Sequence, residues 1–158
     1  MILVTVGTEL PFDRLIRTVD EWAKETNRTD VFAQIGEGAW KPRFIQSSNF
    51  IEPPEFSRMF SSASVILSHA GAGTILTALR WEKPILVMPR RATLGEQRNE
   101  HQMATARRFA ESGKVGVAFD ETELREKLEH IEEVKAHLKI GPYASEELQA
   151  KIRDFIVH

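Results

Sequence analysis

Residues 68–74 have the residue types of a site that binds an anionic group. They read Ser-His-Ala-Gly-Ala-Gly-Thr and follow a short apolar run at 65–67, which predicts a β-strand. Gly71 and Gly73 would let backbone N–H groups approach a ligand closely, at the start of a helix whose positive end favours negative charge. His69 adds an imidazole at the same edge. We interpret the segment as a phosphate cradle; the alternative is an ordinary strand-to-helix turn that requires small residues.

A second polar segment follows the next predicted strand. Arg90 and Arg91 could pair with a phosphate or with the carboxylate of an acidic sugar, although solvated loop charge is the alternative for each. Further polar side chains follow on the same loop and the next helix, and they suit the hydroxyl groups of a sugar: Glu96, Asn99, Glu100, His101 and Gln102. The alternative for these residues is a hydrated helix start capped by Asn99.

Several other chemistries are disfavoured by what the sequence lacks. With no cysteine there is no disulfide, thiolate metal site or cysteine nucleophile. The five histidines show no metal-ligand spacing, so no metal site is expected. No Gly-x-Ser-x-Gly elbow is present, and no Gly-x-Gly-x-x-Gly follows the first strand as in a dinucleotide-dependent dehydrogenase. Basic and aromatic residues do not interleave as in a nucleic-acid surface.

Alternating strands and helices must position these segments. Apolar runs predict strands at 2–6, 31–35, 44–51, 65–67, 84–88 and 115–119, and helical spacing predicts helices at 11–27, 55–62, 74–81, 100–112, 121–133 and 145–157. This alternation predicts an α/β fold, a single Rossmann-like, doubly wound parallel sheet over residues 1–158, with 121–158 as C-terminal helices. Ligands of such sheets collect at the carboxyl ends of the strands, where the loop Gly7-Thr8-Glu9 also lies.

Composition and charge fit a globular protein with one local anion site. The chain of 158 residues is 42% hydrophobic and 28% charged, with a net charge of -2. Residues 80–114 hold 8 basic and 4 acidic groups, which favours anion binding in this block. The apolar run at 2–4 is far shorter than the roughly 20 residues of a membrane helix, so we expect a cytosolic protein.

Three motifs in one order resemble the glycosyltransferase family 28 C-terminal domain. They are Val4-Thr5-Val6-Gly7-Thr8 with Phe12-Asp13-Leu15-Ile16, then Gln34-Ile35-Gly36-Glu37-Gly38, then the segment at 68–74. The stretch from Pro84 through His101-Gln102 and Ala104 looks especially like the small PssE/EpsF-type subunits of bacterial exopolysaccharide glycosyltransferases. These are relatives of the cytosolic subunit of the dolichol-pathway GlcNAc transferase. The resemblance covers roughly residues 1–120.

The resemblance implies the donor-binding half of a GT-B glycosyltransferase, with a UDP-linked sugar across the strand ends and no metal. By that resemblance, the phosphate or sugar oxygens would contact Gly7 and Thr8, and the uracil would contact Phe50 and Ile51. The diphosphate would be bound by His69, Gly71, Gly73 and Thr74. The sugar would be bound by Glu100, His101 and Gln102. Arg90, Arg91 and Glu96 complete the expected set, with His69 and Arg91 as candidates to stabilise the leaving group. Many relatives grip the ribose with a carboxylate where this chain has Thr77, and Glu96 is the candidate substitute.

One domain would supply only half of such an enzyme, because GT-B transferases bind donor and acceptor on opposite walls of a cleft. The resemblance therefore implies a membrane-associated partner subunit that carries the acceptor wall, the catalytic base and the lipid-linked saccharide acceptor. The complete enzyme would act in exopolysaccharide or capsule synthesis, with this chain cytoplasmic and peripheral at the inner face of the membrane. The alternative is a non-catalytic subunit that activates or stabilises such a transferase, and UDP affinity separates the two.

Overall fold

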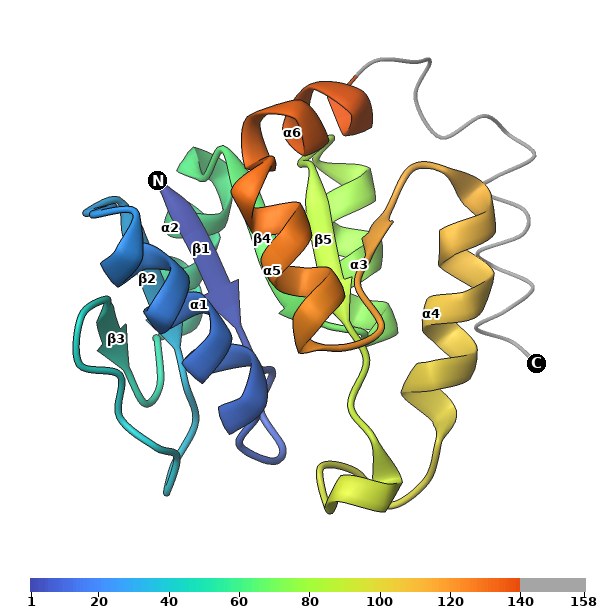
Figure 1. Cartoon of the computed structure of the whole chain (residues 1–158), viewed down its shortest axis with the longest axis horizontal. Helices are drawn as coiled ribbons and strands as arrows, with labels where there is room; N and C mark the ends of the chain where they lie inside the picture. The colour runs from blue at the N-terminus through green and yellow to red at the C-terminus, as the bar shows by residue number, and fades with distance from the viewer. Residues whose placement is uncertain (140–158) are drawn as a thin grey trace.

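Six parallel strands form one sheet in the order β3-β2-β1-β4-β5-β6, shown in Figure 1. The structure, a computed structural model, describes residues 1–139. The strands are β1 (Ile2–Thr5), β2 (Val31–Gln34), β3 (Gln46–Ser48), β4 (Val65–His69), β5 (Ile85–Met88) and β6 (Gly116–Val117). From β1 the chain adds strands toward one edge and then returns to start β4 on the other side of β1. The predicted doubly wound parallel sheet is confirmed, and its switch point lies between β1 and β4.

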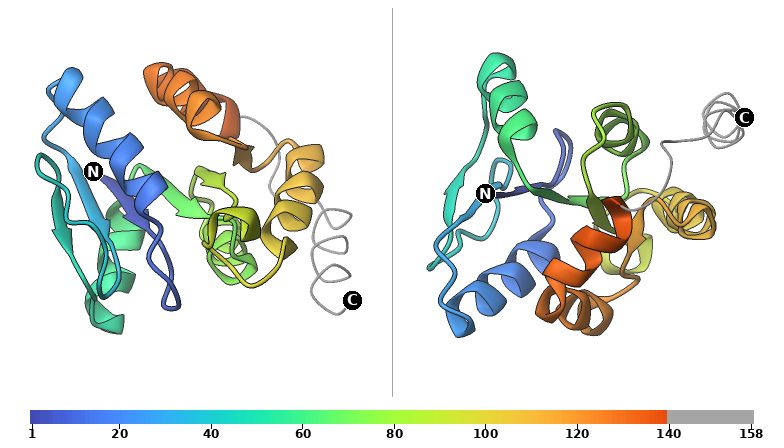
Figure 2. Two further views of the ribbon diagram at one scale, coloured as in Figure 1. Left: turned by 60° about the horizontal axis from the view of Figure 1, so that its bottom comes forward. Right: turned by 90° about the horizontal axis from the view of Figure 1, so that it is seen from above.

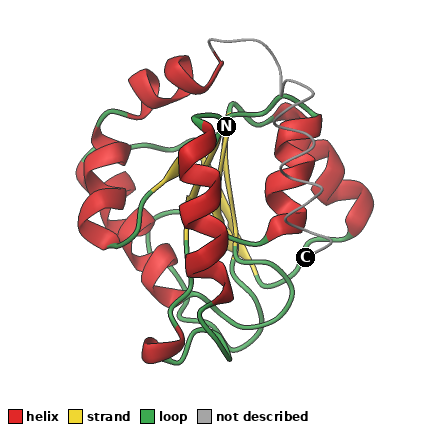
Figure 3. Ribbon diagram, turned by 90° about the vertical axis from the view of Figure 1, so that its right-hand side faces the viewer, coloured by secondary structure: helices red, strands yellow, loops and turns green. Residues whose placement is uncertain are grey.

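Helices connect the strands and cover both faces of the sheet. They are α1 (Asp13–Glu25), α2 (Pro53–Ser62), α3 (Ala72–Arg80), α4 (His101–Ser112), α5 (Glu121–Glu129) and α6 (Ile131–Lys139), with a 3₁₀ turn η1 at Ala92–Leu94. Figure 3 shows helices on both sides of the strands. The strands are buried on both faces, so β1 and β5 are continuous apolar runs rather than alternating ones.

The two faces of the sheet carry two separate cores. Alternate strand residues such as Val4 and Leu67 pack with α1 and α5, while Leu3 and Ile66 pack with the helices α2, α3 and α4. Figure 2 shows α1 and α5 side by side over their face. The strand-end loops of both halves therefore open at one edge, at the bottom of Figure 1.

The predicted helices 11–27, 55–62 and 74–81 have ends one or two residues from those observed, and one further helix prediction is wrong. The single helix predicted over 121–133 is two helices that meet at His130, which ends α5 with its N–H bonded to the Lys127 carbonyl (3.2 Å). Leu124, Leu128 and Ile131 are all buried at helical spacing across this junction, which is why the pattern indicated one helix. Helix α2 begins at Pro53 rather than residue 55, because proline suits a first helical turn.

The last predicted helix, 145–157, lies outside the described residues. Within residues 1–139, no helix combines the length and the apolar character needed to cross a membrane.

Candidate functional site

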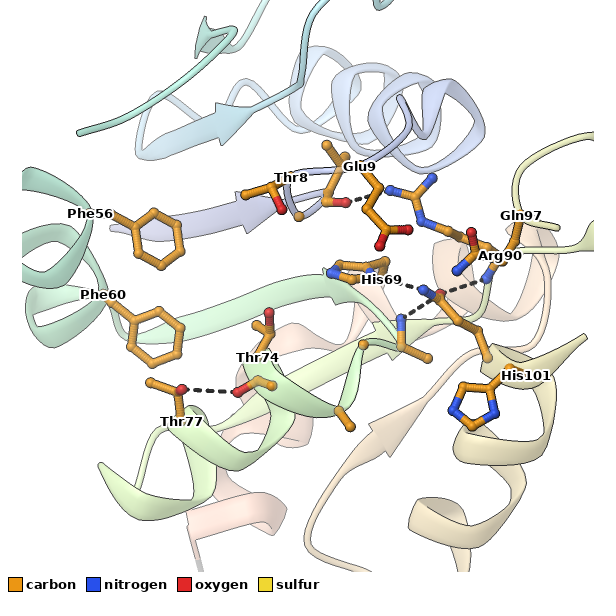
Figure 4. A pocket seen from close by; sticks show the side chains of 17 residues that line it. Thr8, Glu9, Phe56, Phe60, His69, Thr74, Thr77, Arg90, Gln97 and His101 are labelled. Carbon is orange, nitrogen blue, oxygen red and sulfur yellow. Dashed lines mark hydrogen bonds between the residues drawn. The ribbon is translucent and has the colours of Figure 1, made fainter. Parts of the chain in front are cut away.

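A pocket of about 560 Å³ opens at the carboxyl ends of β1 and β4, beside the switch point of the sheet (Figure 4). Its walls come from the loop after β1, from α2, from the β4–α3 segment and from the start of α4. The lining residues are Val6, Gly7, Thr8, Glu9, Phe56, Phe60, His69, Ala70, Gly71, Ala72, Gly73, Thr74, Thr77, Arg90, Gln97, His101 and Gln102. The pocket thus lies where doubly wound sheets bind ligands.

The N-terminus of α3 forms one wall of the pocket. Gly71 is the N-cap residue, and the first intrahelical bond runs from the Ile75 N–H to the Gly71 carbonyl (3.2 Å). The N–H groups of residues 72–74 precede that bond and therefore have no partner inside the helix. Because these amides are the positive end of the helix dipole, this wall can bind a phosphate group.

The imidazole of His69 lies in the same pocket, and Gln102 fixes its protonation pattern. The Gln102 side-chain oxygen accepts hydrogen bonds from the N–H groups of Ala70 (3.2 Å) and Arg90 (3.1 Å). The amide nitrogen of Gln102 must then be the group that lies 3.0 Å from Nδ1 of His69, and it donates to that atom. Nδ1 is an acceptor in this arrangement, so the ring carries its proton on Nε2. His69 can therefore donate a hydrogen bond from Nε2.

His69 is neutral at physiological pH. Burial and the nearby Arg90 guanidinium lower the pKa of His69 to about 4, against the hydrogen bond with Gln102, which raises it. The ring contributes a hydrogen-bond donor rather than a full positive charge. Any favourable charge for an anion in this part of the pocket comes from the helix dipole of α3 and from Arg90.

Arg90 is buried and holds the loop that follows β1. Its guanidinium donates to the backbone carbonyls of Val6, Leu10 (2.6 Å), Pro11 (2.9 Å) and Glu96 (3.2 Å). Only 2% of the residue is exposed. Burial lowers the pKa of this guanidinium, and the carboxylates of Glu96 and Glu9 oppose the change. The donor groups of Arg90 are therefore engaged by the chain itself.

Glu96 and Glu100 organise the loop after β5. The Glu96 carboxylate pairs with Arg14 through two bonds of 2.9 and 3.0 Å and accepts the Arg91 N–H at 2.9 Å. The Glu100 carboxylate accepts the Ala92 N–H at 2.6 Å and lies 3.5 Å from Nε of Arg91. Both carboxylates thus have partners within the chain. At the start of α4, the Asn99 side chain accepts the His101 N–H (2.8 Å).

The pocket brings together nine of the predicted site residues and leaves five outside its lining. Those that line it are Gly7, Thr8, His69, Gly71, Gly73, Thr74, Arg90, His101 and Gln102. Those that do not are Phe50, Ile51, Arg91, Glu96 and Glu100. Phe50 is 55% exposed. Thr77, where many relatives have a carboxylate, does line the pocket, and its hydroxyl donates to the Gly73 carbonyl (2.9 Å).

Eight lining residues were not among the predicted site residues: Val6, Glu9, Phe56, Phe60, Ala70, Ala72, Thr77 and Gln97. Phe56 and Phe60 are four residues apart on α2, a spacing that puts both rings on one helix face, and their centroids are 5.8 Å apart. That spacing is visible in the sequence, but it is equally the spacing of core residues. No cluster of three or more metal-binding side chains occurs among residues 1–139.

A model of the glycosyltransferase family 28 C-terminal domain matches residues 1–155. The chain belongs to this family. The match extends beyond the roughly 120 residues on which the resemblance was based, and it includes every residue that lines the pocket.

Characterised relatives are similar over part of their length. The chain is 36% identical over 78 residues to the "UDP-N-acetylglucosamine transferase subunit ALG13" of Eremothecium gossypii, covering 49% of this chain and 36% of that protein. It is 28% identical over 118 residues to "UDP-N-acetylglucosamine--N-acetylmuramyl-(pentapeptide) pyrophosphoryl-undecaprenol N-acetylglucosamine transferase" of Prochlorococcus marinus, covering 69% of this chain and 31% of that protein. The chain thus spans about a third of these relatives.

Solved structures share the fold at low sequence identity. MurG of Acinetobacter baumannii superposes with a TM-score of 0.63 at 17% identity, over 99% of this chain and 49% of that one. A solution structure of ALG13 gives a TM-score of 0.61 at 19% identity, over 98% of this chain and 94% of that one. These similarities support the predicted fold, which spans about half of the MurG chain and nearly all of the ALG13 chain.

Proposed function

We propose that this chain is the donor-binding component of a glycosyltransferase that uses a UDP-linked sugar. The observation that carries the proposal is that two kinds of hydrogen-bond donor lie in one pocket of a family 28 domain. The free N–H groups at the start of α3 and the Nε2–H of His69 both belong to its lining. Together they suit a diphosphate.

The two ends of the pocket differ in chemistry, which sets the orientation of the ligand. Figure 4 shows Phe56 and Phe60 at one end and Gln97 and His101 at the other, with His69 between them. Aromatic rings suit a nucleoside, and polar side chains suit the hydroxyl groups of a sugar. We therefore place the base near α2, the diphosphate at the start of α3 and the sugar near the start of α4.

The reaction we propose is displacement of UDP by an acceptor hydroxyl. Negative charge grows on the diphosphate as the bond to the sugar breaks. The fixed dipoles at the start of α3 and the Nε2–H of His69 would stabilise that charge without having to reorganise. In this proposal the base that takes the acceptor proton belongs to a partner, and the site works without a metal ion.

The partner we propose is a membrane-associated protein that carries the acceptor wall and a lipid-linked saccharide. Two findings support it: the chain corresponds to about half of a MurG chain, and its relative from Eremothecium gossypii is named as a subunit. We place the chain at the cytoplasmic face of the membrane through that partner. The setting of exopolysaccharide or capsule synthesis stays a prediction, while the relatives named above are GlcNAc transferases.

Calorimetric titration of the chain with UDP, with and without EDTA, tests the proposal. We expect saturable binding that EDTA does not change. Gly73→Leu should abolish it, because Gly73 lines the pocket and a Cβ there meets no atom of the chain within 4 Å, which leaves the added side chain room to occupy the space of the ligand. The control is Ala110→Leu, which adds the same side chain on the exposed face of α4.

The result separates the proposal from its alternative. Loss of UDP binding in Gly73→Leu with retention in Ala110→Leu supports a donor site in this pocket. Absence of UDP binding by the wild-type chain, alone and together with its partner, would instead support a non-catalytic subunit that only stabilises the transferase.

A further inference from the structure

We propose that the pocket accepts nucleotides of the 2′-deoxyribose series as well as those of ribose, and that Thr77 is the residue responsible. This inference rests on the proposed function, since it assigns a substrate class to the same pocket. It concerns the nucleoside end of the pocket, between Phe56 and the start of α3.

The ribose of a bound nucleotide would lie against α3. In a nucleoside diphosphate the ribose joins the base to the phosphates, so it falls between the rings on α2 and the N–H groups of residues 72–74. Thr74 and Thr77 are three residues apart on one face of α3, and both line the pocket. Figure 4 shows them on the same side of His69 as Phe60. Thr77 lies one turn beyond the diphosphate position, where the ribose is expected.

The hydroxyl of Thr77 has little to offer a ribose. Its one proton is donated to the Gly73 carbonyl (2.9 Å), so it can only accept a hydrogen bond from a ribose hydroxyl. A carboxylate would instead accept bonds from both ribose hydroxyls, and these would be charge-assisted. The Thr77 hydroxyl is also exposed, so a ribose hydroxyl would replace a water molecule there with a small net gain.

The single carboxylate among the lining residues of the described chain, that of Glu9, lies elsewhere in the pocket. Its charge acts on the Arg90 guanidinium, and Figure 4 shows Glu9 on the Arg90 side, away from Phe60. The other hydroxyls near the nucleoside end, those of Thr8 and Thr74, are neutral. A site rejects an analogue that lacks a hydroxyl strongly only when a buried polar group of the site is then left unpaired. Loss of the 2′-hydroxyl leaves no such group here.

UDP and dUDP test this inference, because they differ only in the 2′-hydroxyl. Titration of the full chain with both, at one salt concentration, gives a ratio of dissociation constants. We expect dUDP to bind within about threefold of UDP. In Thr77→Glu, dUDP should bind about tenfold more weakly than UDP or worse, because the new carboxylate accepts a hydrogen bond that only ribose can donate. Repulsion between this carboxylate and the diphosphate affects both ligands equally and cancels in the ratio.

Thr18→Glu is the matched control. Thr18 lies on α1, and its hydroxyl donates to the carbonyl four residues earlier, that of Arg14 (2.8 Å), as the Thr77 hydroxyl does to Gly73. It does not line the pocket. The variant therefore makes the same substitution in the same local setting, and its ratio should equal that of the wild-type chain.

The outcomes separate this inference from the proposed function. A wild-type chain that binds UDP tenfold or more tightly than dUDP would overturn the inference and leave the proposed function standing. A ratio in Thr77→Glu equal to that of the wild type would show that Thr77 is not at the ribose. If the added charge prevents both ligands from binding, neutral Thr77→Gln replaces it, and its ratio should exceed that of the wild type; an equal ratio again excludes Thr77. If UDP fails to bind the wild-type chain, with or without the partner, the proposed function fails and this inference fails with it.

Discussion

The ring of His69 occupies the space that a side chain at Gly71 would need. A Cβ on Gly71 would lie 2.2 Å from Cε1 of His69, and a Cβ on Gly7 would lie 2.7 Å from Nε2 of the same ring. Gly71 has an ordinary φ of -82°, so its backbone gives no reason for glycine. The imidazole itself therefore requires Gly71. Close approach of a ligand, the reason suggested by the sequence, is not needed to explain this glycine.

Gly71→Ala should lower the free energy of unfolding by about 2 kcal/mol, because the new methyl group displaces a packed ring. Urea denaturation measures the loss. The double variant with His69→Ala should recover at least about 1 kcal/mol of it, since the two residues are in contact. Gly73→Ala is the matched control: it adds a methyl group in the same helical turn, where nothing lies within 4 Å, and should not destabilise the chain. Equal losses in both single variants would contradict this account.

The free energy of unfolding should depend on His69 between pH 6.5 and 4. An unfolded histidine titrates near 6.5, while the pKa of folded His69 is lowered to about 4. Between these values the unfolded chain binds a proton that the folded chain does not, so acidification favours unfolding. The contribution is complete above pH 6.5 and falls by about 2–3 kcal/mol on acidification to pH 4. The measurement is the difference between wild type and His69→Asn in urea at several pH values. A difference that stays constant from pH 7 to 4 would disprove the assignment.

Gln102→Glu should raise the pKa of His69 by at least about one unit. One carboxylate oxygen can still accept the N–H groups of Ala70 and Arg90, but the other replaces the amide donor beside Nδ1. The ring then gains a partner that favours its protonated form. NMR titration of the imidazole reports the change. Gln46→Glu, which adds the same charge at an exposed position on β3, should leave the titration of His69 in place.

The sheet and the glycine segment could be predicted from the sequence because their determinants are local. Continuous apolar runs such as those of β4 and β5 are typical of strands buried on both faces, and parallel strands require crossover helices. The turn after β4 combines small residues with the start of a helix. The residue types at 68–74 were therefore enough to predict that α3 begins there and forms one wall of the pocket. The pairing of α1 with α5 and the junction at His130 depend on packing between distant segments, which periodicity does not reveal.

The role of Arg90 in holding the loop after β1 could not be predicted either, and the reason is different. The same guanidinium can lie in solvent, bind a phosphate or satisfy backbone carbonyls, and its sequence neighbours are similar in each case. Its partners Val6 and Leu10 are 84 and 80 residues away in the chain. The sequence placed Glu9 in a strand-end loop but did not include it among the site residues, because the position of that loop depends on its bonds to Arg90.

Arg90→Met should lower the free energy of unfolding by about 3 kcal/mol or more. Methionine keeps much of the side-chain volume but donates no hydrogen bond, so the carbonyls of Val6, Leu10 and Pro11 lose a shared partner in a buried place. Arg91→Met is the control, because it removes the same charge from a partly exposed side chain whose carboxylate partner is 3.5 Å away, and it should cost less than about 1 kcal/mol. Urea denaturation gives both values. Hydrogen exchange at residues 7–12 should also accelerate in Arg90→Met alone, since the loop loses its anchor. If both variants lose the same free energy of unfolding and show the same hydrogen exchange at residues 7–12, Arg90 is not the residue that holds this loop.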